Sequence, residues 1–213
     1  MHHRERPRMM PRSLWRDGSP HVRRKTARYT GSMFQMRSFK HCKLCGGPVA
    51  YRMPAEDNRD RATCTVCGHV HYENPLNVVG TVPVWGEQVL LCRRNIEPRY
   101  GLWTLPAGFM ELGETLAEGA VRETVEEAGA RIELEGLYTV LNVVRVGQVH
   151  FFYRARLLDT AFAPGPETIE AQLFAEAEVP WDELAFRTVR ETLLRYFEDR
   201  RRGEFGIHCA DIG

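Results

Sequence analysis

The sequence predicts an α/β sandwich in which strands surround a helix rich in carboxylates, preceded by a small metal-binding segment. Three observations indicate this arrangement. Two cysteine pairs occur early in the chain, at 42–45 and 64–67. Runs rich in β-branched and aromatic residues lie on both sides of a helical pattern at 116–128, and a second amphipathic pattern covers 185–203. Strands that alternate with separate helices are typical of layered α/β domains.

Length and composition suit one globular domain of ordinary size with a small appendage. The chain has 213 residues, of which 43% are hydrophobic. No apolar run approaches the roughly 18–20 residues that a membrane helix needs, and the longest candidate, at 78–85, has the length of a strand. We therefore expect a soluble, cytoplasmic protein with no membrane partner.

Charge divides the chain into a basic front and an acidic body. Residues 1–41 hold 11 Lys and Arg against only Glu5 and Asp17, whereas the remainder holds 18 basic and 26 acidic residues. The acidic body argues against nucleic-acid binding by the folded part. We expect residues 1–41 to be a disordered basic tail or an over-extended start, with Met33 or Met36 as the true first residue.

Two alternatives for the front segment stay open. An organelle transit peptide has a similar composition, and would move the location to a plastid or mitochondrion. A nucleic-acid-binding arm is the other alternative.

The paired cysteines predict a zinc ribbon at 42–72. Each pair has two intervening residues and a following glycine, so both thiolates can meet one ion while a tight turn aims backbone N–H groups at the sulfurs. Four thiolates complete tetrahedral Zn²⁺, which indicates a structural role and leaves the nearby histidines outside the site. Four ordinary cysteines, or a redox pair, are the alternatives. The ligands would be Cys42, Cys45, Cys64 and Cys67.

Strand and helix patterns follow the cysteines. Residues 77–85 and 88–94 are β-rich runs separated by Gly86 and Glu87, which predicts a hairpin. A stretch with Pro and Gly at 101–109 then opens the carboxylate helix. Downstream, the expected elements are two strands, a loop that enters a short strand, and a helix with apolar residues four apart: 131–146, 149–158, 162–173 and 185–203.

The carboxylate helix has clear ends. Thr115 followed by Glu118 forms a capping box, and Gly129 stands where a C′ glycine belongs. On a helical wheel the apolar residues Val121, Val125 and Ala128 fall opposite the carboxylates. We therefore expect this helix to bury the apolar stripe and to aim its carboxylates the other way.

The clustering of Glu123, Glu126 and Glu127 on one stripe needs a compensating charge. Like charges three or four residues apart cost roughly 0.2–0.5 kcal/mol per pair, and only Arg122 is near. A solvated acidic face is the alternative, but such faces usually intersperse lysines. Carboxylate oxygens suit Mg²⁺ or Mn²⁺, so the pattern favours a divalent-cation site.

The spacing of the stretch around this helix resembles the Nudix box at every fixed position. Thr124 and Ala130 occupy two usually aliphatic positions, which are mild departures. The resemblance implies a Nudix α/β/α sandwich with a mixed sheet over 73–213. It also implies hydrolysis of nucleoside diphosphates linked to another moiety, with Mg²⁺ or Mn²⁺. The matching residues are Gly108, Glu114, Arg122, Glu123, Glu126, Glu127 and Gly129.

The resemblance also implies roles for these residues. The three clustered glutamates would hold the metal, or one of them would act as base, most naturally Glu123 or Glu126. Arg122 would orient those carboxylates with support from Glu114, and Gly108 would allow a close approach of substrate.

Several residues outside the box are further candidates. Family members often carry another acidic residue on a later loop, and Glu170 is the first candidate for an extra ligand or base, with Glu167 second; a solvated loop position is the alternative. Arg93 or Arg94 could contact phosphate. Trp103 and Phe109 could stack on a flat ring, or pack in the core.

Flanking segments suggest a substrate. The runs "LLCRRNIEPRYGLWTLPAGFMELGE" and "FAPGPETIEAQLFAEAEVPWDELAF", with "GIH" near the end, look similar to a plant-plastid-type FAD pyrophosphatase and its bacterial relatives, over about 42–209. This resemblance implies cleavage of FAD to FMN and AMP. A Ser-Gln-Pro-Trp-type motif of the NADH branch is missing after the box, and Val146 stands where ADP-ribose enzymes carry proline. The coenzyme-A motif is not matched.

Other readings remain beside this one. ADP-ribose or NADH could be the main substrate. A Nudix-like chain can also be a nucleotide-binding regulator that lost catalysis, although such chains usually have broken box carboxylates. The ribbon could serve as a nucleic-acid adaptor, but it mixes Arg and Asp without a basic stripe. The expected partner is a dinucleotide or nucleoside-diphosphate substrate, and a homodimer is possible.

Overall fold

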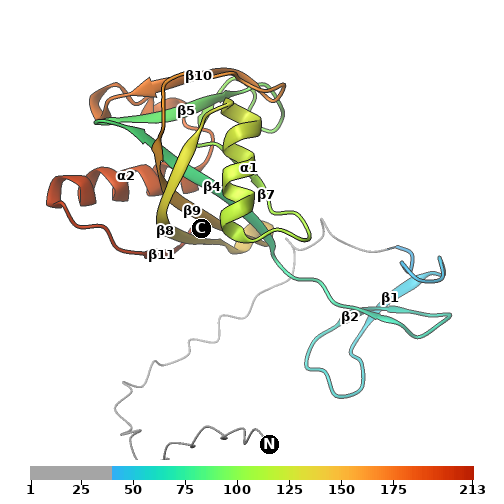
Figure 1. The fold of residues 1–213 in the computed structure, drawn as a ribbon. Helices are drawn as coiled ribbons and strands as arrows, with labels where there is room; N and C mark the ends of the chain where they lie inside the picture. The colour runs from blue at the N-terminus through green and yellow to red at the C-terminus, as the bar shows by residue number, and fades with distance from the viewer. Residues whose placement is uncertain (1–39) are drawn as a thin grey trace, which may run out of the picture. The chain divides into compact units, whose positions relative to one another are not determined.

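The computed structural model describes residues 40–213, so nearly all of the predicted basic tail lies outside the described residues. The described chain contains a small three-stranded sheet and a larger eight-stranded sheet accompanied by two long helices (Figure 1). Each is described by itself below.

The small sheet carries the cysteine pairs. Strands β1 (Val49–Arg52), β2 (Arg61–Cys64) and β3 (Val70–His71) form an antiparallel sheet in the order β1-β2-β3. Cys42 and Cys64 are buried, although the unit has few apolar residues inside. A unit of this size with so little core needs an additional source of stability, and a bound metal is one such source.

The large sheet is mixed. Its order is β10-β5-β4-β9-β8-β11, with β7 on β4 and β6 on β5. Strand β4 runs parallel to β9, and β8 runs parallel to β11, whereas the other pairings are antiparallel. The strands are β4 (Leu76–Trp85), β5 (Gln88–Arg94), β6 (Trp103–Thr104), β7 (Ala107–Phe109), β8 (Ile132–Val143), β9 (Gln148–Leu157), β10 (Thr168–Phe174) and β11 (His208–Asp211).

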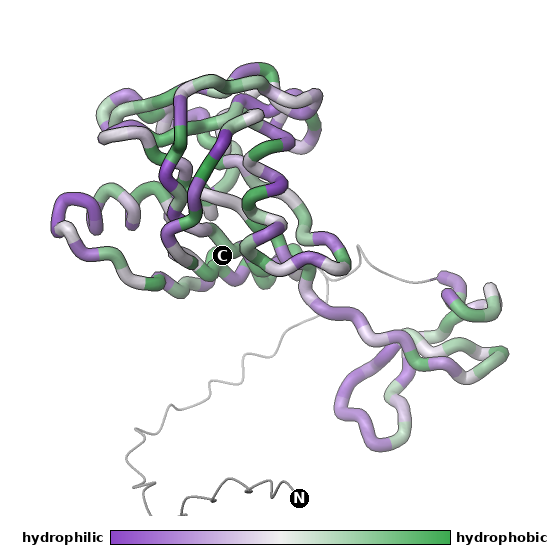
Figure 2. The backbone as a smooth tube through the Cα atoms, viewed as in Figure 1, coloured by the Kyte–Doolittle hydropathy of each residue, from purple (hydrophilic) through white to green (hydrophobic). Residues whose placement is uncertain are grey.

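The two helices α1 (Leu116–Ala128) and α2 (Arg187–Arg202) cover opposite faces of this sheet (Figure 1). Successive strand residues point to opposite faces. In β5, Val89 and Leu91 pack with α2 in one core cluster, while Leu90 and Cys92 pack with the end of α1 in the other. Along α2, hydrophobic and hydrophilic residues alternate, as expected of a helix with one buried face (Figure 2). The predicted α/β/α sandwich is confirmed.

Most predicted elements are present, with three differences. The strand expected at 131–146 ends at Val143, because a 3₁₀ turn at Val144–Val146 and Gly147 with φ of 63° reverse the chain. The stretch at 101–109, for which no strand was predicted, contains β6 and β7. Strand β11 had no sequence prediction, because its four residues pair only with the distant β8. Two further 3₁₀ turns cover Glu176–Glu178 and Trp181–Glu183.

The expected orientation of α1 is correct for Ala128, which is buried, and for Glu126, which is exposed, but wrong for three other residues. Val125 is exposed, whereas Glu123 and Glu127 are buried at 8% and 7% exposure. The helix turns its small residues toward the sheet, and Thr124 shares a 2.6 Å hydrogen bond with Thr81 of β4. This close approach buries the carboxylates beside the small residues. A wheel that ranks residues only by hydropathy cannot anticipate it.

A buried polar network joins α2, β8 and β11. Asp199 accepts a 3.0 Å hydrogen bond from the hydroxyl of Tyr138 and lies 2.6 Å from Nε2 of His208. Burial alone would raise the pKa of Asp199, but the hydrogen bonds from His208 and Tyr138 outweigh it and hold the pKa below its ordinary value of 3.8. Ionised Asp199 therefore stabilises the docking of β11.

We expect Asp199→Asn to lower the free energy of unfolding by about 1–3 kcal/mol at neutral pH, because it weakens two hydrogen bonds, one buried and one partly buried. The stability that ionised Asp199 contributes is present above the unfolded pKa and is lost as the pH falls through the lower folded pKa. Urea unfolding should therefore show a difference from wild type that shrinks in strong acid. Asp182→Asn, on an exposed side chain, should show no difference at either pH; a constant loss for Asp199→Asn would contradict the electrostatic account.

Neither α1 nor α2, nor any shorter helix within residues 40–213, has the length and apolar character needed to cross a bilayer.

Candidate functional site

Arg122 on α1 is the centre of an array of carboxylates. Its Nε and Nη2 atoms donate hydrogen bonds of 2.9 and 2.8 Å to Glu114. Its Nη1 atom donates to Glu123 at 2.7 Å and to Glu126 at 3.1 Å. Nη2 also donates to the backbone carbonyl of Phe109 at 3.1 Å. One guanidinium thus joins the loop before α1 to three carboxylates, and it holds the pKa of Glu114 down at about 2.

Two of the carboxylates are buried. Burial raises the pKa of Glu123 despite the hydrogen bond from Arg122. Burial also raises the pKa of Glu127 to about 8, although Oε2 of Glu127 accepts a 3.0 Å hydrogen bond from the backbone N–H of Ala107. Within residues 40–213 Glu127 has no ion pair. A nearby positive charge would favour its ionised form.

Gly108 allows Glu123 to lie against the backbone of β7. A Cβ atom at Gly108 would overlap the Glu123 carboxylate, well inside van der Waals contact. Strand β7 pairs with β4, so this backbone is fixed by the sheet. The site therefore consists of two buried carboxylates at residues 123 and 127 that lie against the backbone at 107 and 108.

The donor set fits a hard divalent cation. The raised pKa values of the two buried carboxylates show that the positive charge around them does not compensate for their burial. Carboxylate oxygens are the ligands that Mg²⁺ and Mn²⁺ prefer. The three box glutamates do not converge on one point, because Arg122 lies between Glu123 and Glu126 while Glu127 turns toward Ala107. Glu126 is the most accessible of the three, with 58% of its side chain exposed.

The cysteine site fits zinc. The four Sγ atoms of Cys42, Cys45, Cys64 and Cys67 lie within 4.8 Å of one another, and no other such group of metal-binding side chains is found in residues 40–213. Two of the S···S distances are 3.5 and 3.7 Å, close to the roughly 3.8 Å edge of a tetrahedron with Zn–S bonds of about 2.3 Å.

Backbone N–H groups support the sulfurs as the knuckle spacing predicts. Leu44 donates to Cys42, and Val66 and Cys67 donate to Cys64, each at 3.4 Å. The N–H of Cys67 is the main cause that lowers the pKa of the Cys64 thiol to about 6. A low thiol pKa favours the thiolate form that binds metal.

The predicted residues outside the box have different surroundings. Glu170 forms a 3.1 Å ion pair with Arg93, and both side chains are more than 40% exposed. Glu167, in contrast, is close enough to both Glu123 and Glu127 to raise their pKa values by charge repulsion. Of the two loop candidates, only Glu167 adds charge repulsion at Glu123 and Glu127, and its effect on their pKa values is smaller than that of burial.

Arg94 and Trp103 are both largely buried. Arg94 donates from Nε to the carbonyl of Pro98 at 3.0 Å, and its charge acts to lower the pKa of Glu127. The Trp103 ring packs in the α2-side core, at 4.9 Å and 79° from Phe174. Of the two aromatic candidates, the exposed Phe109 (52%) remains accessible to a ligand.

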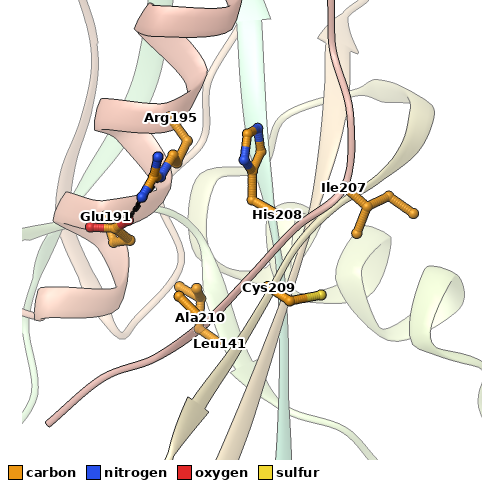
Figure 3. Close-up of a pocket in the computed structure, with 7 residues that line it drawn as sticks. All are labelled: Leu141, Glu191, Arg195, Ile207, His208, Cys209 and Ala210. Carbon is orange, nitrogen blue, oxygen red and sulfur yellow. Dashed lines mark hydrogen bonds and ion pairs between the residues drawn. The ribbon is translucent and has the colours of Figure 1, made fainter. Parts of the chain in front are cut away.

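A pocket of about 240 Å³ lies away from this array, where the end of the chain crosses α2 and β8 (Figure 3). Glu191 and Arg195 of α2 form an ion pair on one side, and the β11 segment closes the other. Its remaining lining residues are Leu141, Ile207, His208, Cys209 and Ala210. It contains no box residue and is smaller than typical ligand pockets of about 300–1,000 Å³.

Comparisons with family models match both parts of the chain. A model described as "NUDIX domain" matches residues 75–197, and a model described as "Nudix N-terminal" matches residues 40–73. The first match covers more than half of the chain.

Individual relatives show the same similarity. A curated relative, the NAD-capped RNA hydrolase NudC of Klebsiella pneumoniae subsp. pneumoniae, is 32% identical over 97 residues, which are 46% of this chain. The match spans only 36% of that relative, so this chain corresponds to about a third of its length.

Solved structures extend the similarity. A NUDIX hydrolase from Nitrosomonas europaea is 48% identical, with a TM-score of 0.79 over 82% of this chain and 99% of its own. An ADP-ribose pyrophosphatase from Streptococcus suis is 25% identical, with a TM-score of 0.53 over 65% of this chain and 100% of its own. A UDP-X diphosphatase is 26% identical, with a TM-score of 0.53 over 65% and 69%.

Proposed function

Because the chain belongs to the NUDIX family, we propose that it hydrolyses the phosphoanhydride bond of nucleoside diphosphate derivatives with Mg²⁺ or Mn²⁺, and that FAD is its preferred substrate. The observation that carries this proposal is the pair of buried carboxylates, Glu123 and Glu127, held against the backbone of β7 beside a complete box. Burying two carboxylates is costly unless a cation compensates them.

Each box residue has a role that follows from its contacts. Glu123, Glu126 and Glu127 would hold the metal, which when bound neutralises phosphate charge and lowers the pKa of an attacking water. Arg122 fixes Glu123 and Glu126 through one Nη1 atom, so it is a positioning residue. Glu126, which is exposed, and Glu123, which is buried, remain the candidates for the base, as the family resemblance suggests.

Glu167 is a better candidate than Glu170 for the additional carboxylate. A group that orients water must reach the box, and Glu167 is the loop carboxylate whose charge acts on both buried glutamates. Glu170 would first have to leave its ion pair with Arg93.

Substrate contacts are proposed for Arg94, Gly108 and Phe109. Arg94 is buried, its charge acts to lower the pKa of Glu127, and its Nε atom donates to the carbonyl of Pro98, so its terminal nitrogens would be the phosphate donors. Gly108 permits close approach at β7. Phe109, rather than Trp103, offers an exposed ring on which a flat base or flavin can stack.

The substrate class rests on what the relatives share. Their names include NAD-capped RNA, ADP-ribose and UDP-X, and each of these contains a diphosphate linked to a nucleoside. FAD belongs to the same class. The FAD preference rests on the flanking resemblance and on the missing markers of the NADH, ADP-ribose and coenzyme-A branches.

We expect kcat/KM for FAD to exceed that for NADH and ADP-ribose, with FMN and AMP as products identified by mass. A panel of FAD, NADH, ADP-ribose and coenzyme A, assayed with Mg²⁺ and with Mn²⁺, gives the ranking. A tenfold preference for ADP-ribose over FAD, about 1.4 kcal/mol of transition-state stabilisation, would overturn the FAD assignment and leave the phosphoanhydride chemistry intact. Binding of these nucleotides without any turnover would instead favour a regulator.

A further inference from the structure

The last turn of α1 is completed by a distant loop. Carbonyl groups at a helix C-terminus have no partners within the helix, and α1 has no basic residue in its last turn. The backbone N–H of Ala163 donates to the carbonyl of Ala128 at 2.9 Å, and the backbone N–H of Gly165 donates to the backbone carbonyl of Glu127 at 3.1 Å. The loop at 163–168 therefore caps the turn that carries two box glutamates.

The fit at Gly165 is too close for any side chain. A Cβ atom there would overlap the backbone carbonyl oxygen of Glu126. The φ angle of Gly165 lies outside the left-handed region, so alanine could adopt the local backbone conformation. The need for glycine at this position therefore comes from the contact with α1 and not from the loop conformation.

The same loop is fastened to β5 on its other side. The backbone N–H of Asn95 donates to the carbonyl of Glu167 at 2.8 Å, and Nδ2 of Asn95 donates to the carbonyl of Pro166 at 2.9 Å. A further hydrogen bond of 3.0 Å from the N–H of Thr168 to the carbonyl of Gly165 closes a turn around Glu167. Glu167 is thus held from two elements at once.

We propose that Gly165 and Asn95 form a latch that fixes the 163–168 loop between the last turn of α1 and the end of β5, and thereby positions Glu167 beside the turn that carries Glu126 and Glu127. This inference rests on the proposed function. The latch joins Asn95, directly after β5, to the last turn of α1, and Glu167 lies in the loop between them. The latch residues are positioning residues, because only their backbone and amide groups take part.

Gly165→Ala tests the latch, and Gly206→Ala is the matched control because a Cβ at Gly206 meets nothing within 4 Å. Gly165→Ala should lower kcat by on the order of tenfold to a hundredfold, as misplacement of reacting groups does, with little change in KM. It should also weaken Mn²⁺ binding, measured by calorimetry without substrate, since displaced Glu167 contributes less negative charge. Gly206→Ala should match wild type in both measurements.

A double-mutant cycle separates positioning from general damage. If Gly165 acts through Glu167, then Gly165→Ala should cost much less kcat in a Glu167→Gln background than in wild type. Equal losses in both backgrounds would overturn the proposal, as would unchanged kcat and Mn²⁺ affinity in folded Gly165→Ala. If Gly165→Ala does not fold, Asn95→Ala tests the latch instead, because it removes only the exposed hydrogen bond from Nδ2 to Pro166. Asn95→Ala should then lower both kcat and Mn²⁺ affinity. Wild-type values of both would overturn the latch.

Failure of the proposed function would look different. In that case wild type and Gly206→Ala would hydrolyse no nucleoside diphosphate derivative with either metal. The Mn²⁺ affinity would then still test the latch, because the calorimetric measurement requires no substrate. A loss of Mn²⁺ affinity in Gly165→Ala that is much smaller in the Glu167→Gln background would support the latch. Equal losses in both backgrounds, or equal affinities in all variants, would refute it.

Discussion

Glu127→Gln is expected to reduce kcat by about a thousandfold or more, which corresponds to about 4 kcal/mol, while the fold stays intact. Glutamine keeps the size of the side chain, and its amide oxygen can still accept the hydrogen bond from the N–H of Ala107. It removes the negative charge that the cation site needs. Because burial already raises the pKa of Glu127, a neutral side chain at this position should be tolerated by the fold.

Steady-state kinetics and thermal unfolding, measured on the same preparation, check this expectation. Glu118→Gln is the matched control: it makes the same change on α1, and glutamine still closes the capping box with Thr115. The control should retain wild-type activity. Full activity of Glu127→Gln would refute the metal-binding role of Glu127, and its unfolding would show that the carboxylate has a structural role.

The second large effect concerns zinc. We expect one Zn²⁺ per chain at the four cysteines, and we expect its removal to unfold the 42–72 segment. Structural zinc binding is itself folding free energy, about 10–16 kcal/mol in small zinc domains, and the small sheet has little apolar core. The large sheet has two core clusters of its own, so hydrolysis should change less than the structure of the ribbon.

Metal analysis of protein made in zinc-replete cells without chelators gives the stoichiometry. Cys42→Ser should lose zinc and the dispersed NMR signals of the segment, whereas Cys209→Ser, on an exposed cysteine outside the cluster, should keep both. Absence of zinc in the wild-type protein would count decisively against the site.

Local signals predicted the ends of α1 and the zinc knuckles well. The capping box at Thr115 and Glu118 and the left-handed Gly129 are present as expected, because caps depend on neighbouring residues. The cysteine cluster likewise depends on the two residues that separate the cysteines within each pair. These features require only local backbone geometry, which residue types specify directly.

Features that depend on tertiary contacts could not be predicted in this way. The burial of Glu123 and Glu127 arises because small residues bring α1 close to β4, and a helical wheel ranked Val125 as buried instead. The ion pair between Glu170 and Arg93 likewise follows from the register of β5 and β10, which the sequence does not reveal. The glycine and proline before Glu167 signalled a turn but not its contact with α1.

Hydrolysis in H₂¹⁸O tests the central claim most directly. The protein is incubated in labelled water with FAD, ADP-ribose or NADH, once with Mg²⁺ or Mn²⁺ and once with excess EDTA. The masses of the products are then measured by mass spectrometry. Attack of water on phosphorus predicts cleavage between the two phosphates of at least one substrate. One ¹⁸O atom should appear in one of the two monophosphate products, and cleavage should cease in EDTA. Undiminished cleavage in excess EDTA, or intact diphosphates under every condition, would contradict a metal-dependent phosphoanhydride hydrolase.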